Sequence, residues 1–355
     1  MPLPAEHTAW VAGLSPWPDD GFGLGRMQAL LAELGDPQKA YPAVHVVGTN
    51  GKSTATRTIE ELLLADGLSV GATISPHVRS WSERIRVAGQ EADLEAALAR
   101  VRPAAERLGA TQFEAITAAA LAEFATAGVD AAVVEAGLGG RLDATNVLGA
   151  RVVLLTNVSL EHTEVLGETP EQIAREKLAV AHARSIVVLP DNSYTPLVPD
   201  CRVVLGGARE AAEAFLGRPI AAQVDVRLPG RLERRGEDEL RDGAHNPAGV
   251  EWLVRRLPPV DHSIVCSILR GKDAAAMLEG LAAVGSRFVA TQSSNERSLQ
   301  ADELARLAAP FFDHVETSAE PQAALARAHA LGGPVLVTGS LYLLADLEAK
   351  EREAA

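Results

Sequence analysis

Short apolar runs alternate with amphipathic segments along the first two thirds of the chain. Five of these runs have the length and the residue types of buried strands: residues 44–47, 69–75, 129–135, 151–157 and 184–190. Helical spacing of apolar residues occurs in five other segments: residues 22–35, 54–66, 93–108, 113–127 and 171–182. This alternation predicts an α/β fold, in which a parallel sheet carries helices on both faces.

The pattern changes near Val224. Pro229-Gly230-Arg231 predicts an elbow between domains, and the polar residues 233–238 predict a surface turn. Beyond them lies a smaller alternation, with strands at residues 262–269, 286–291 and 334–338 and helices that begin near Pro247, Ala274, Ala301 and Pro321. We therefore predict two domains, a larger one over residues 1–228 and a smaller Rossmann-like one over residues 229–355.

A glycine-containing turn follows the first predicted strand. It consists of Gly48-Thr49-Asn50-Gly51-Lys52-Ser53-Thr54 and leads directly into a predicted helix. In such a turn the glycines leave backbone N–H groups open to phosphate oxygens, the lysine neutralises the outer phosphates, and a hydroxyl holds Mg²⁺. An ordinary turn is the alternative, but the flanking strand and helix favour a site for a nucleoside triphosphate, with either Ser53 or Thr54 on the metal.

Polar residues end two other predicted strands. Ser75 and His77 flank Pro76 after one of them, and Glu135 ends another, just before a glycine-rich loop. Ligands bind at the carboxyl ends of the strands in open α/β sheets, so Glu135 is predicted to be a carboxylate directed at a metal rather than a solvated acid. Residues 81–87 are predicted to form one extended segment, with Arg84 and Arg86 on one face. These two arginines would either meet an anionic substrate or be solvated.

The remaining candidate residues are harder to interpret from spacing. A lone His162 is usually structural, and a lone helical Lys177 is usually solvated. Asn246 suits a helix N-cap and Pro247 the first helical turn. This leaves Asp242 and His245 unexplained, and both would face the cleft expected beside the elbow.

Composition narrows the class of protein. The chain has 355 residues, a net charge of −14 and 47% hydrophobic residues. An acidic chain repels nucleic-acid phosphates, so no nucleic-acid partner is expected. No apolar run approaches the roughly 20 residues that span a membrane, and no signal-peptide pattern begins the chain. Cys201 and Cys266 are expected to be reduced, which favours a cytoplasmic protein.

Taken together, the motifs resemble the folylpolyglutamate synthase/dihydrofolate synthase family of the Mur ligase superfamily. The resemblance covers nearly the whole chain and lies in the motifs at residues 21–34, 45–52, 75–77, 83–85, 113–117, 135–146, 161–163, 173–177, 229–233, 242–247 and 338–343. The last two motifs favour the folate branch over the cell-wall ligases.

The resemblance implies a role for each candidate residue. The ATP phosphates would be bound by Gly48, Thr49, Asn50, Gly51, Lys52, Ser53 and Thr54. Ser75 and Glu135 would serve a Mg²⁺ beside the γ-phosphate, and His162 a second Mg²⁺. Lys177 matches the lysine that the family carbamylates with CO₂. The smaller domain would reach the nucleotide through Asp242, His245 and Asn246, with closure at the elbow before catalysis.

The implied reaction joins L-glutamate to dihydropteroate, to a reduced folate, or to both, with ATP and Mg²⁺, in a monomeric enzyme. A Mur-type ligase for another carboxylate and a non-catalytic nucleotide-binding scaffold are the alternatives. The chain departs from the family pattern at Ser53, where glycine is usual, and at Glu161, where aspartate is usual. It also lacks the aspartate that commonly precedes Lys272-Asp273. The chain is shorter than is usual for the family, mostly after Ser185.

Overall fold

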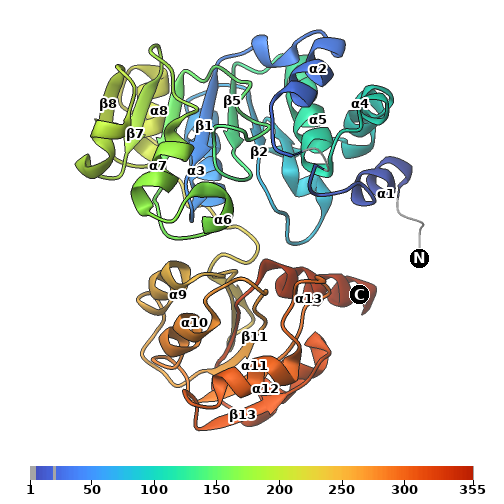
Figure 1. The fold of residues 1–355 in the computed structure, drawn as a ribbon, viewed down its shortest axis with the longest axis vertical. Coiled ribbons are helices and arrows are strands. Elements are labelled where there is room, and N and C mark those ends of the chain that lie inside the picture. Colours follow the sequence, from blue (N-terminus) through green and yellow to red (C-terminus); the bar gives the residue numbers. More distant parts are fainter. Residues whose placement is uncertain (1–4, 19–20, 355) are drawn as a thin grey trace. The chain divides into compact units, whose positions relative to one another are not determined.

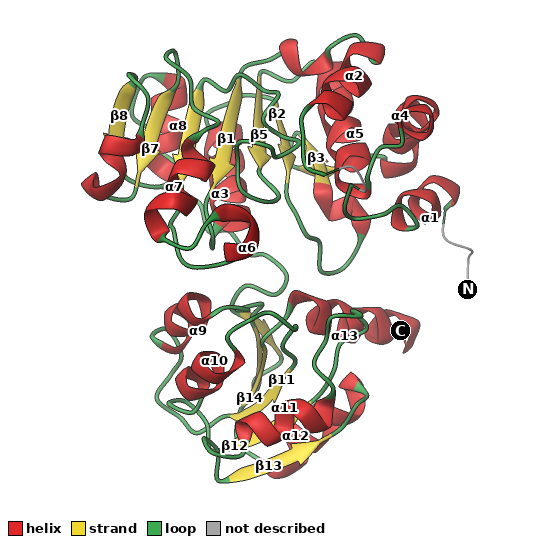
Figure 2. Cartoon of the chain, in the orientation of Figure 1, coloured by secondary structure: helices red, strands yellow, loops and turns green. Residues whose placement is uncertain are grey.

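The computed structural model describes residues 5–18 and 21–354, and it divides the chain into two compact units, residues 1–226 and 227–355 (Figure 1). Each unit consists of a twisted sheet between helices (Figure 2). Both sheets are mostly parallel, as the alternating pattern predicts. The α/β fold predicted from the sequence is thus confirmed.

The first unit is built on an eight-stranded sheet in the order β4-β3-β2-β5-β1-β6-β7-β8. The strands are β1 (Ala43–Val47), β2 (Val70–Thr73), β3 (Ile85–Val87), β4 (Gln90–Glu91), β5 (Ala131–Glu135), β6 (Val152–Leu155), β7 (Ile186–Leu189) and β8 (Arg202–Leu205). The α-helices are α1 (Glu6–Ala12), α2 (Gly25–Glu33), α3 (Lys52–Ala65), α4 (Leu94–Leu108), α5 (Gln112–Ala127), α6 (Thr163–Leu166), α7 (Pro170–Leu178) and α8 (Ala208–Leu216). β3 pairs in the antiparallel sense with both β2 and β4, at one edge of the sheet.

Helices cover both faces of this sheet, because alternate residues of each central strand point to opposite sides. Val44 and Val46 of β1 pack with α3 and α8, whereas Val47 packs in the core formed with α4 and α5. All five residues of β1 and of β5 are buried, which explains their continuous apolar sequence. The ladder aligns Val46 with Glu135, so the carboxyl ends of β1 and β5 lie side by side.

The segment at residues 81–87 differs from its prediction as one extended stretch. Trp81–Arg84 forms a 3-10 helix, and only Ile85–Val87 is a strand. The cause is a capping box, in which Ser80 and Glu83 satisfy each other's backbone N–H groups at the start of the turn.

The second unit has a six-stranded sheet in the order β13-β12-β11-β14-β10-β9, with only β9 antiparallel. Its strands are β9 (Glu233–Arg235), β10 (Glu239–Arg241), β11 (Ser263–Cys266), β12 (Arg287–Ala290), β13 (His314–Thr317) and β14 (Val335–Thr338). Its helices are α9 (Pro247–Val254), α10 (Ala274–Leu281), α11 (Ala301–Ala308), α12 (Pro321–Leu331) and α13 (Leu341–Ala354). The surface turn predicted at residues 233–238 is wrong in part, since it begins with β9.

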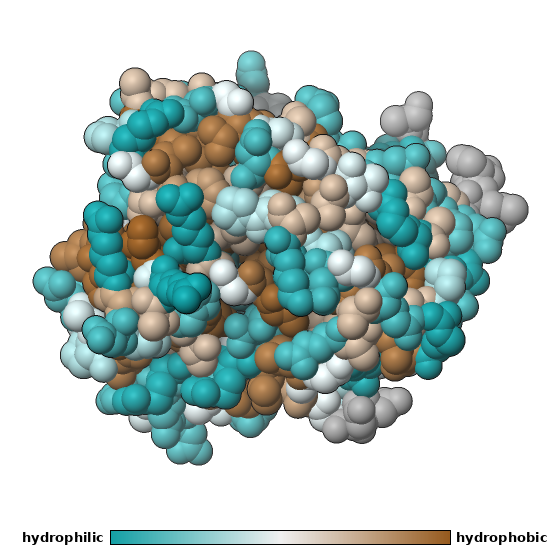
Figure 3. Space-filling view, turned by 90° about the horizontal axis from the view of Figure 1, so that it is seen from above, coloured by the Kyte–Doolittle hydropathy of each residue, from teal (hydrophilic) through white to brown (hydrophobic). Residues whose placement is uncertain are grey.

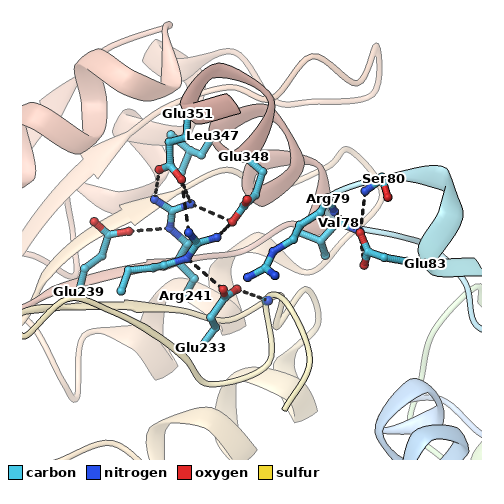
Figure 4. Close-up of polar contacts among 12 residues, drawn as sticks. Val78, Arg79, Ser80, Glu83, Glu233, Glu239, Arg241, Leu347, Glu348 and Glu351 are labelled. Carbon is cyan, nitrogen blue, oxygen red and sulfur yellow. Dashed lines mark hydrogen bonds and ion pairs between the residues drawn. The ribbon is translucent and has the colours of Figure 1, made fainter. Parts of the chain in front are cut away.

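Ionic contacts explain why the polar strand β9 is stable. Arg241 contacts Glu239 at 2.6 Å and also pairs with Glu351 of α13 (Figure 4). Arg235 pairs with Glu233 at 2.9 Å and with Glu348 of α13. Charged side chains of β9, β10 and α13 thus neutralise one another, a pairing that the hydrophobic pattern alone does not reveal.

Hydrophilic and hydrophobic residues are interspersed over the face drawn in Figure 3. Within residues 5–18 and 21–354, no helix combines the length and the apolarity required to cross a membrane. Cys201 and Cys266 are both free thiols, as predicted.

Candidate active site

The predicted phosphate turn connects β1 to α3. Gly51 adopts φ of 79°, a left-handed conformation that favours glycine, directly before the first helical residue, Lys52. Gly48 has φ of 148°, and a Cβ there would overlap the Thr156 hydroxyl. The backbone conformation and the close packing therefore explain why both positions are glycine. The turn leads into the N-terminus of a helix, which is a favourable place for anions.

Residues at the end of β6 hold the turn in shape. The Asn50 N–H donates to Asn157 Oδ1 at 2.9 Å, and the Asn157 side-chain amide donates to the Asn50 carbonyl at 3.0 Å. Thr156 Oγ1 donates to the same carbonyl at 2.7 Å, and the Thr49 N–H donates to the Asn157 carbonyl at 3.0 Å. Thr156 and Asn157 were not predicted as site residues. They directly follow β6, the strand next to β1, and so lie where ligands bind in such sheets.

Glu135 lies between the turn and the end of β2. Its Oε1 accepts a hydrogen bond from Ser53 Oγ at 3.1 Å, and its Oε2 accepts one from the Ser75 N–H at 3.1 Å. The side chain is nearly buried, with the residue 3% exposed. Ser53 is buried beside it, whereas Thr54 is exposed. The structure therefore brings Ser53, Ser75 and Glu135 together, as expected of residues that serve one cation.

These oxygen donors fit Mg²⁺, a hard cation that prefers carboxylate and hydroxyl oxygens. Among the described residues, no group of three or more His, Cys, Asp or Glu side chains is placed to hold a metal. A site with a single carboxylate and a hydroxyl beside a phosphate turn is the type that Mg²⁺ uses, because the ion keeps several waters and shares substrate oxygens. A structural zinc site would require more protein ligands.

Lys177 of α7 lies against the same turn. Its Nζ donates to the Gly48 carbonyl at 2.9 Å, and the residue is only 4% exposed. Burial, helped by the positive charge of Lys52, lowers the pKa of Lys177 to about 7, although Glu161, Asp143 and Glu176 oppose the shift. Lys177 is therefore neither solvated nor fully protonated at neutral pH, unlike a typical helical lysine.

Lys52, the lysine of the turn itself, folds back over its own loop. Its Nζ donates to the Thr49 carbonyl at 3.2 Å. Both amines thus contact carbonyl oxygens of the segment that is expected to receive phosphates.

The loop after β5 positions α7 through very close backbone packing. A Cβ at Gly140 would lie 2.5 Å from the Lys177 carbonyl oxygen and 2.7 Å from that of Glu176. The Arg141 N–H donates to the Glu176 carbonyl at 3.1 Å. Only glycine allows this approach. The glycine-rich motif therefore helps to position Lys177.

We expect Gly140→Ala to destabilise the fold by about 1–3 kcal/mol, because α7 must move to accept the methyl group. Thermal unfolding measures this loss. Gly207→Ala is the matched control, since a Cβ at Gly207 meets nothing closer than 4.0 Å. Equal unfolding temperatures for the two variants would contradict the packing argument.

A buried polar chain anchors the same loop to β1. Asp143 accepts hydrogen bonds from the N–H groups of Leu138 at 2.7 Å and Thr145 at 2.9 Å, and from the Thr145 hydroxyl. His45 Nε2 lies 2.7 Å from that hydroxyl. Burial raises the pKa of Asp143 and lowers that of His45 to about 3, so His45 is neutral. These hydrogen bonds hold the loop after β5 against β1.

His162 directly precedes α6 and adopts φ of 50°. Its Nε2 lies 4.0 Å from Glu161 Oε1, and its Nδ1 lies 3.8 Å from Glu164 Oε1. The imidazole is therefore beside two carboxylates in the loop that follows β6.

Arg84 and Arg86 both have protein partners. Arg84 Nε donates to His77 Nδ1 at 3.0 Å, and its guanidinium lies 4.4 Å from the Trp81 ring centroid. Arg86 Nε donates to Glu60 Oε1 at 3.0 Å. Simple solvation, one of the two alternatives for this pair, is therefore wrong.

In the second unit, Asp242 and Asn246 shape the loop between β10 and α9. Asp242 accepts hydrogen bonds from the N–H groups of Leu232 at 2.8 Å and Ala244 at 2.9 Å, and burial raises its pKa. Asn246 caps α9 through the Gly249 N–H at 2.8 Å, as its position before Pro247 predicts. His245 Nδ1 lies 2.8 Å from the Gly243 carbonyl oxygen.

Comparisons with known proteins agree with this geometry. Residues 46–202 match the Mur ligase middle domain. The chain is 31% identical to dihydrofolate synthase/folylpolyglutamate synthase of Escherichia coli over 92% of this chain and 90% of that one, and 30% identical to that of Mycobacterium tuberculosis over 85% and 81%. It spans about half the length of a Haloferax volcanii relative, a probable bifunctional folylpolyglutamate synthase/dihydropteroate synthase, with 32% identity over 91% of this chain.

Solved structures extend the similarity to the fold. Escherichia coli FolC in complex with DHPP and ADP matches with a TM-score of 0.87 and 26% identity over 98% of both chains. The bifunctional enzyme of Yersinia pestis complexed with AMPPNP and Mn ion matches with a TM-score of 0.83 and 27% identity over 97% of both. The chain belongs to the folylpolyglutamate synthase/dihydrofolate synthase family of ATP-dependent ligases.

Proposed function

We propose that the protein joins L-glutamate to the carboxylate of dihydropteroate, of a reduced folate, or of both, and that it drives amide formation with ATP. The observation that carries this proposal is the gathering of Ser53, Ser75 and Glu135 beside a phosphate turn that Lys52 and the buried Lys177 also contact. Support for the substrate class comes from relatives that include one with Mn, AMPPNP and L-glutamate bound.

The chemistry requires two steps, because a carboxylate is too poor an electrophile for an amine. A carboxylate oxygen of the pteroate or folate substrate attacks the γ-phosphorus, and the bond to the β-γ bridging oxygen breaks, which gives an acyl phosphate and ADP. The α-amino group of glutamate then attacks the acyl carbon and loses a proton, and inorganic phosphate leaves as the amide forms.

The protein must first bring two anions together. Lys52 would leave the Thr49 carbonyl and donate to phosphate oxygens, where its charge stabilises the transferring group. The backbone N–H groups of residues 48–54 would bind the other phosphate oxygens. Ser53, Ser75 and Glu135 would hold Mg²⁺, which when bound offsets the negative charge of substrate and triphosphate.

The remaining predicted residues have proposed supporting roles. His162 would serve a second Mg²⁺ in the loop after β6. Asp242 and Asn246 would shape the loop of the second unit that presents His245 to the nucleotide, since both side chains bond to its backbone. These roles rest on the resemblance and on local geometry.

Product mass spectrometry tests the proposed function. Dihydropteroate and tetrahydrofolate are each incubated with ATP, Mg²⁺ and glutamate, and a UDP-linked peptide serves as the comparison acceptor. Addition of glutamate to either pteridine is the expected result. Turnover only on the UDP-linked peptide would establish a Mur-type ligase instead, and nucleotide binding without any product would establish a scaffold.

Lys177 is proposed to form a carbamate, in which the neutral amine attacks CO₂ and releases a proton. The step needs an unprotonated amine, and the lowered pKa of about 7 supplies one at neutral pH. The product replaces a cation with anionic oxygens, which suit a hard metal.

The pH dependence follows from this pKa. The pKa is depressed, so the neutral fraction grows as pH rises through about 7, and carbamate formation at fixed CO₂ should rise with it. Carbon-13 NMR under labelled CO₂ measures the carbamate signal. Lys177→Arg should remove the signal, whereas Lys39→Arg, at an exposed lysine paired with Asp36, should retain it. A signal that survives in Lys177→Arg would refute the assignment.

We further propose that the protein is a monomer in the cytoplasm, which agrees with its free cysteines. Light scattering during size-exclusion chromatography measures the mass. A measured mass of twice that of one chain at micromolar concentration would contradict the proposal of a monomer.

A further inference from the structure

Arg57 is a buried arginine of α3 to which the proposed reaction assigns no role. It lies one helical turn beyond Ser53 and is only 4% exposed. Its Nη1 contacts Glu60 Oε2 at 2.7 Å, and its Nη2 donates to the Glu83 main-chain carbonyl at 2.6 Å. A buried guanidinium is costly unless it is paired, so these contacts fix where the Glu83 carbonyl can lie.

Glu83 in turn organises the segment that follows Ser75. Its carboxylate accepts hydrogen bonds from the N–H groups of Val78 at 3.3 Å and Ser80 at 2.6 Å, and also from that of Arg79 (Figure 4). Residues 78–83 therefore form one folded turn. Arg57 of α3 donates a hydrogen bond to the main chain of that turn, at the Glu83 carbonyl.

The same segment is held a second time at the candidate metal site. The Ser75 N–H donates to Glu135 Oε2, and Ser53 Oγ donates to Glu135 Oε1, both at 3.1 Å. Arg57 and Glu135 thus link α3 to residues 75–83 from two sides.

We propose that Arg57 is a positioning residue that holds residues 75–83 against α3 and thereby sets the spacing of Ser53, Ser75 and Glu135 for the divalent cation. The inference rests on the proposed function, which places the cation there. Mg²⁺ and Mn²⁺ bind through close oxygen contacts, and loss of a residue that orients metal ligands typically weakens binding about 10–100-fold.

Mn²⁺ binding without turnover tests the proposal. Free Mn²⁺ is counted by electron paramagnetic resonance while it is titrated into the full chain saturated with a non-hydrolysable ATP analogue. Arg57→Met should weaken Mn²⁺ binding about tenfold. Metal-free ADP should bind within about twofold of wild type, because the phosphate turn is untouched. Arg218→Met removes an exposed arginine paired with Asp66 and serves as the matched control.

Two results would overturn the inference. One is a folded Arg57→Met protein that retains wild-type Mn²⁺ affinity. The other is a loss of Mn²⁺ affinity and of metal-free ADP affinity to the same degree, which would indicate general damage. Should Arg57→Met fail to fold, Arg57→Lys decides, because lysine keeps the charge but lacks the two-pronged geometry and should still weaken Mn²⁺ binding. Wild-type protein that binds no Mn²⁺ with the analogue would instead refute the metal site of the proposed function.

Discussion

Lys52→Met is expected to lower kcat for glutamate-dependent ADP release by about 10²–10³-fold. The substrate carboxylate and the triphosphate repel each other, and Lys52 supplies positive charge at the first residue of α3, where the transferring phosphate would lie. Methionine retains the length of the side chain but provides neither charge nor a donor.

Steady-state assays of ADP release measure the effect. Lys39→Met removes a lysine whose side chain is largely exposed and pairs only with a neighbouring acid, and it should leave kcat within about twofold. The unfolding temperature of Lys52→Met should match that of wild type, since the hydrogen bond from Lys52 Nζ to the Thr49 carbonyl is long, at 3.2 Å, and only partly buried. A wild-type kcat in Lys52→Met would contradict the assignment of residues 48–54 as the phosphate site.

Glu135→Gln is expected to raise the Mg²⁺ concentration for half-maximal activity by at least about 100-fold. The substitution keeps the size of the side chain and one carbonyl acceptor, but it removes the charge that would bind the cation. Glu135 is buried and contacts both Ser53 and Ser75, so its carboxylate lies at the point where the cation would be held.

Magnesium titrations of the activity measure this shift. Glu123→Gln alters a glutamate of α5 that pairs with Arg100 on the surface, so its titration should match wild type. If Glu135→Gln were saturated at the same Mg²⁺ concentration as wild type, the carboxylate would not be a metal ligand.

The pattern of hydrophobic residues predicted the centre of the fold well. β1, β5 and β6 are buried on both faces, so their sequences are continuous apolar runs that only a central strand explains. The phosphate turn was predictable for a different reason, since its glycines and Lys52 have a recognisable spacing between a strand and a helix.

Peripheral elements were missed because contacts, rather than periodicity, stabilise them. β9 is polar and depends on pairing with β10 and on the ion pairs of Arg235. β13 has no fully buried residue and therefore lacks an apolar run. The 3-10 turn at Trp81–Arg84 did have a local signal, a serine three residues before Glu83, which is the spacing of a capping box.

Some candidate site residues were likewise predictable from the sequence pattern, whereas others depend on contacts made only in the folded chain. Glu135 was predictable as an acid at the end of an apolar strand. Lys177 was identified only by resemblance, because its burial against the Gly48 carbonyl depends on the close packing at Gly140. Arg57 was missed, since an arginine on a helix does not differ in sequence from a solvated one. Asn157 was missed although its place after an apolar strand was the same signal that identified Glu135.

The central claim is that ATP activates the substrate carboxylate as an acyl phosphate. Dihydropteroate or tetrahydrofolate, whichever the protein extends, is labelled with oxygen-18 in its acceptor carboxylate, and the released phosphate is analysed by mass spectrometry. Transfer of one labelled oxygen to phosphate for each amide formed is the predicted result. Amide formation that leaves the phosphate unlabelled would contradict the account.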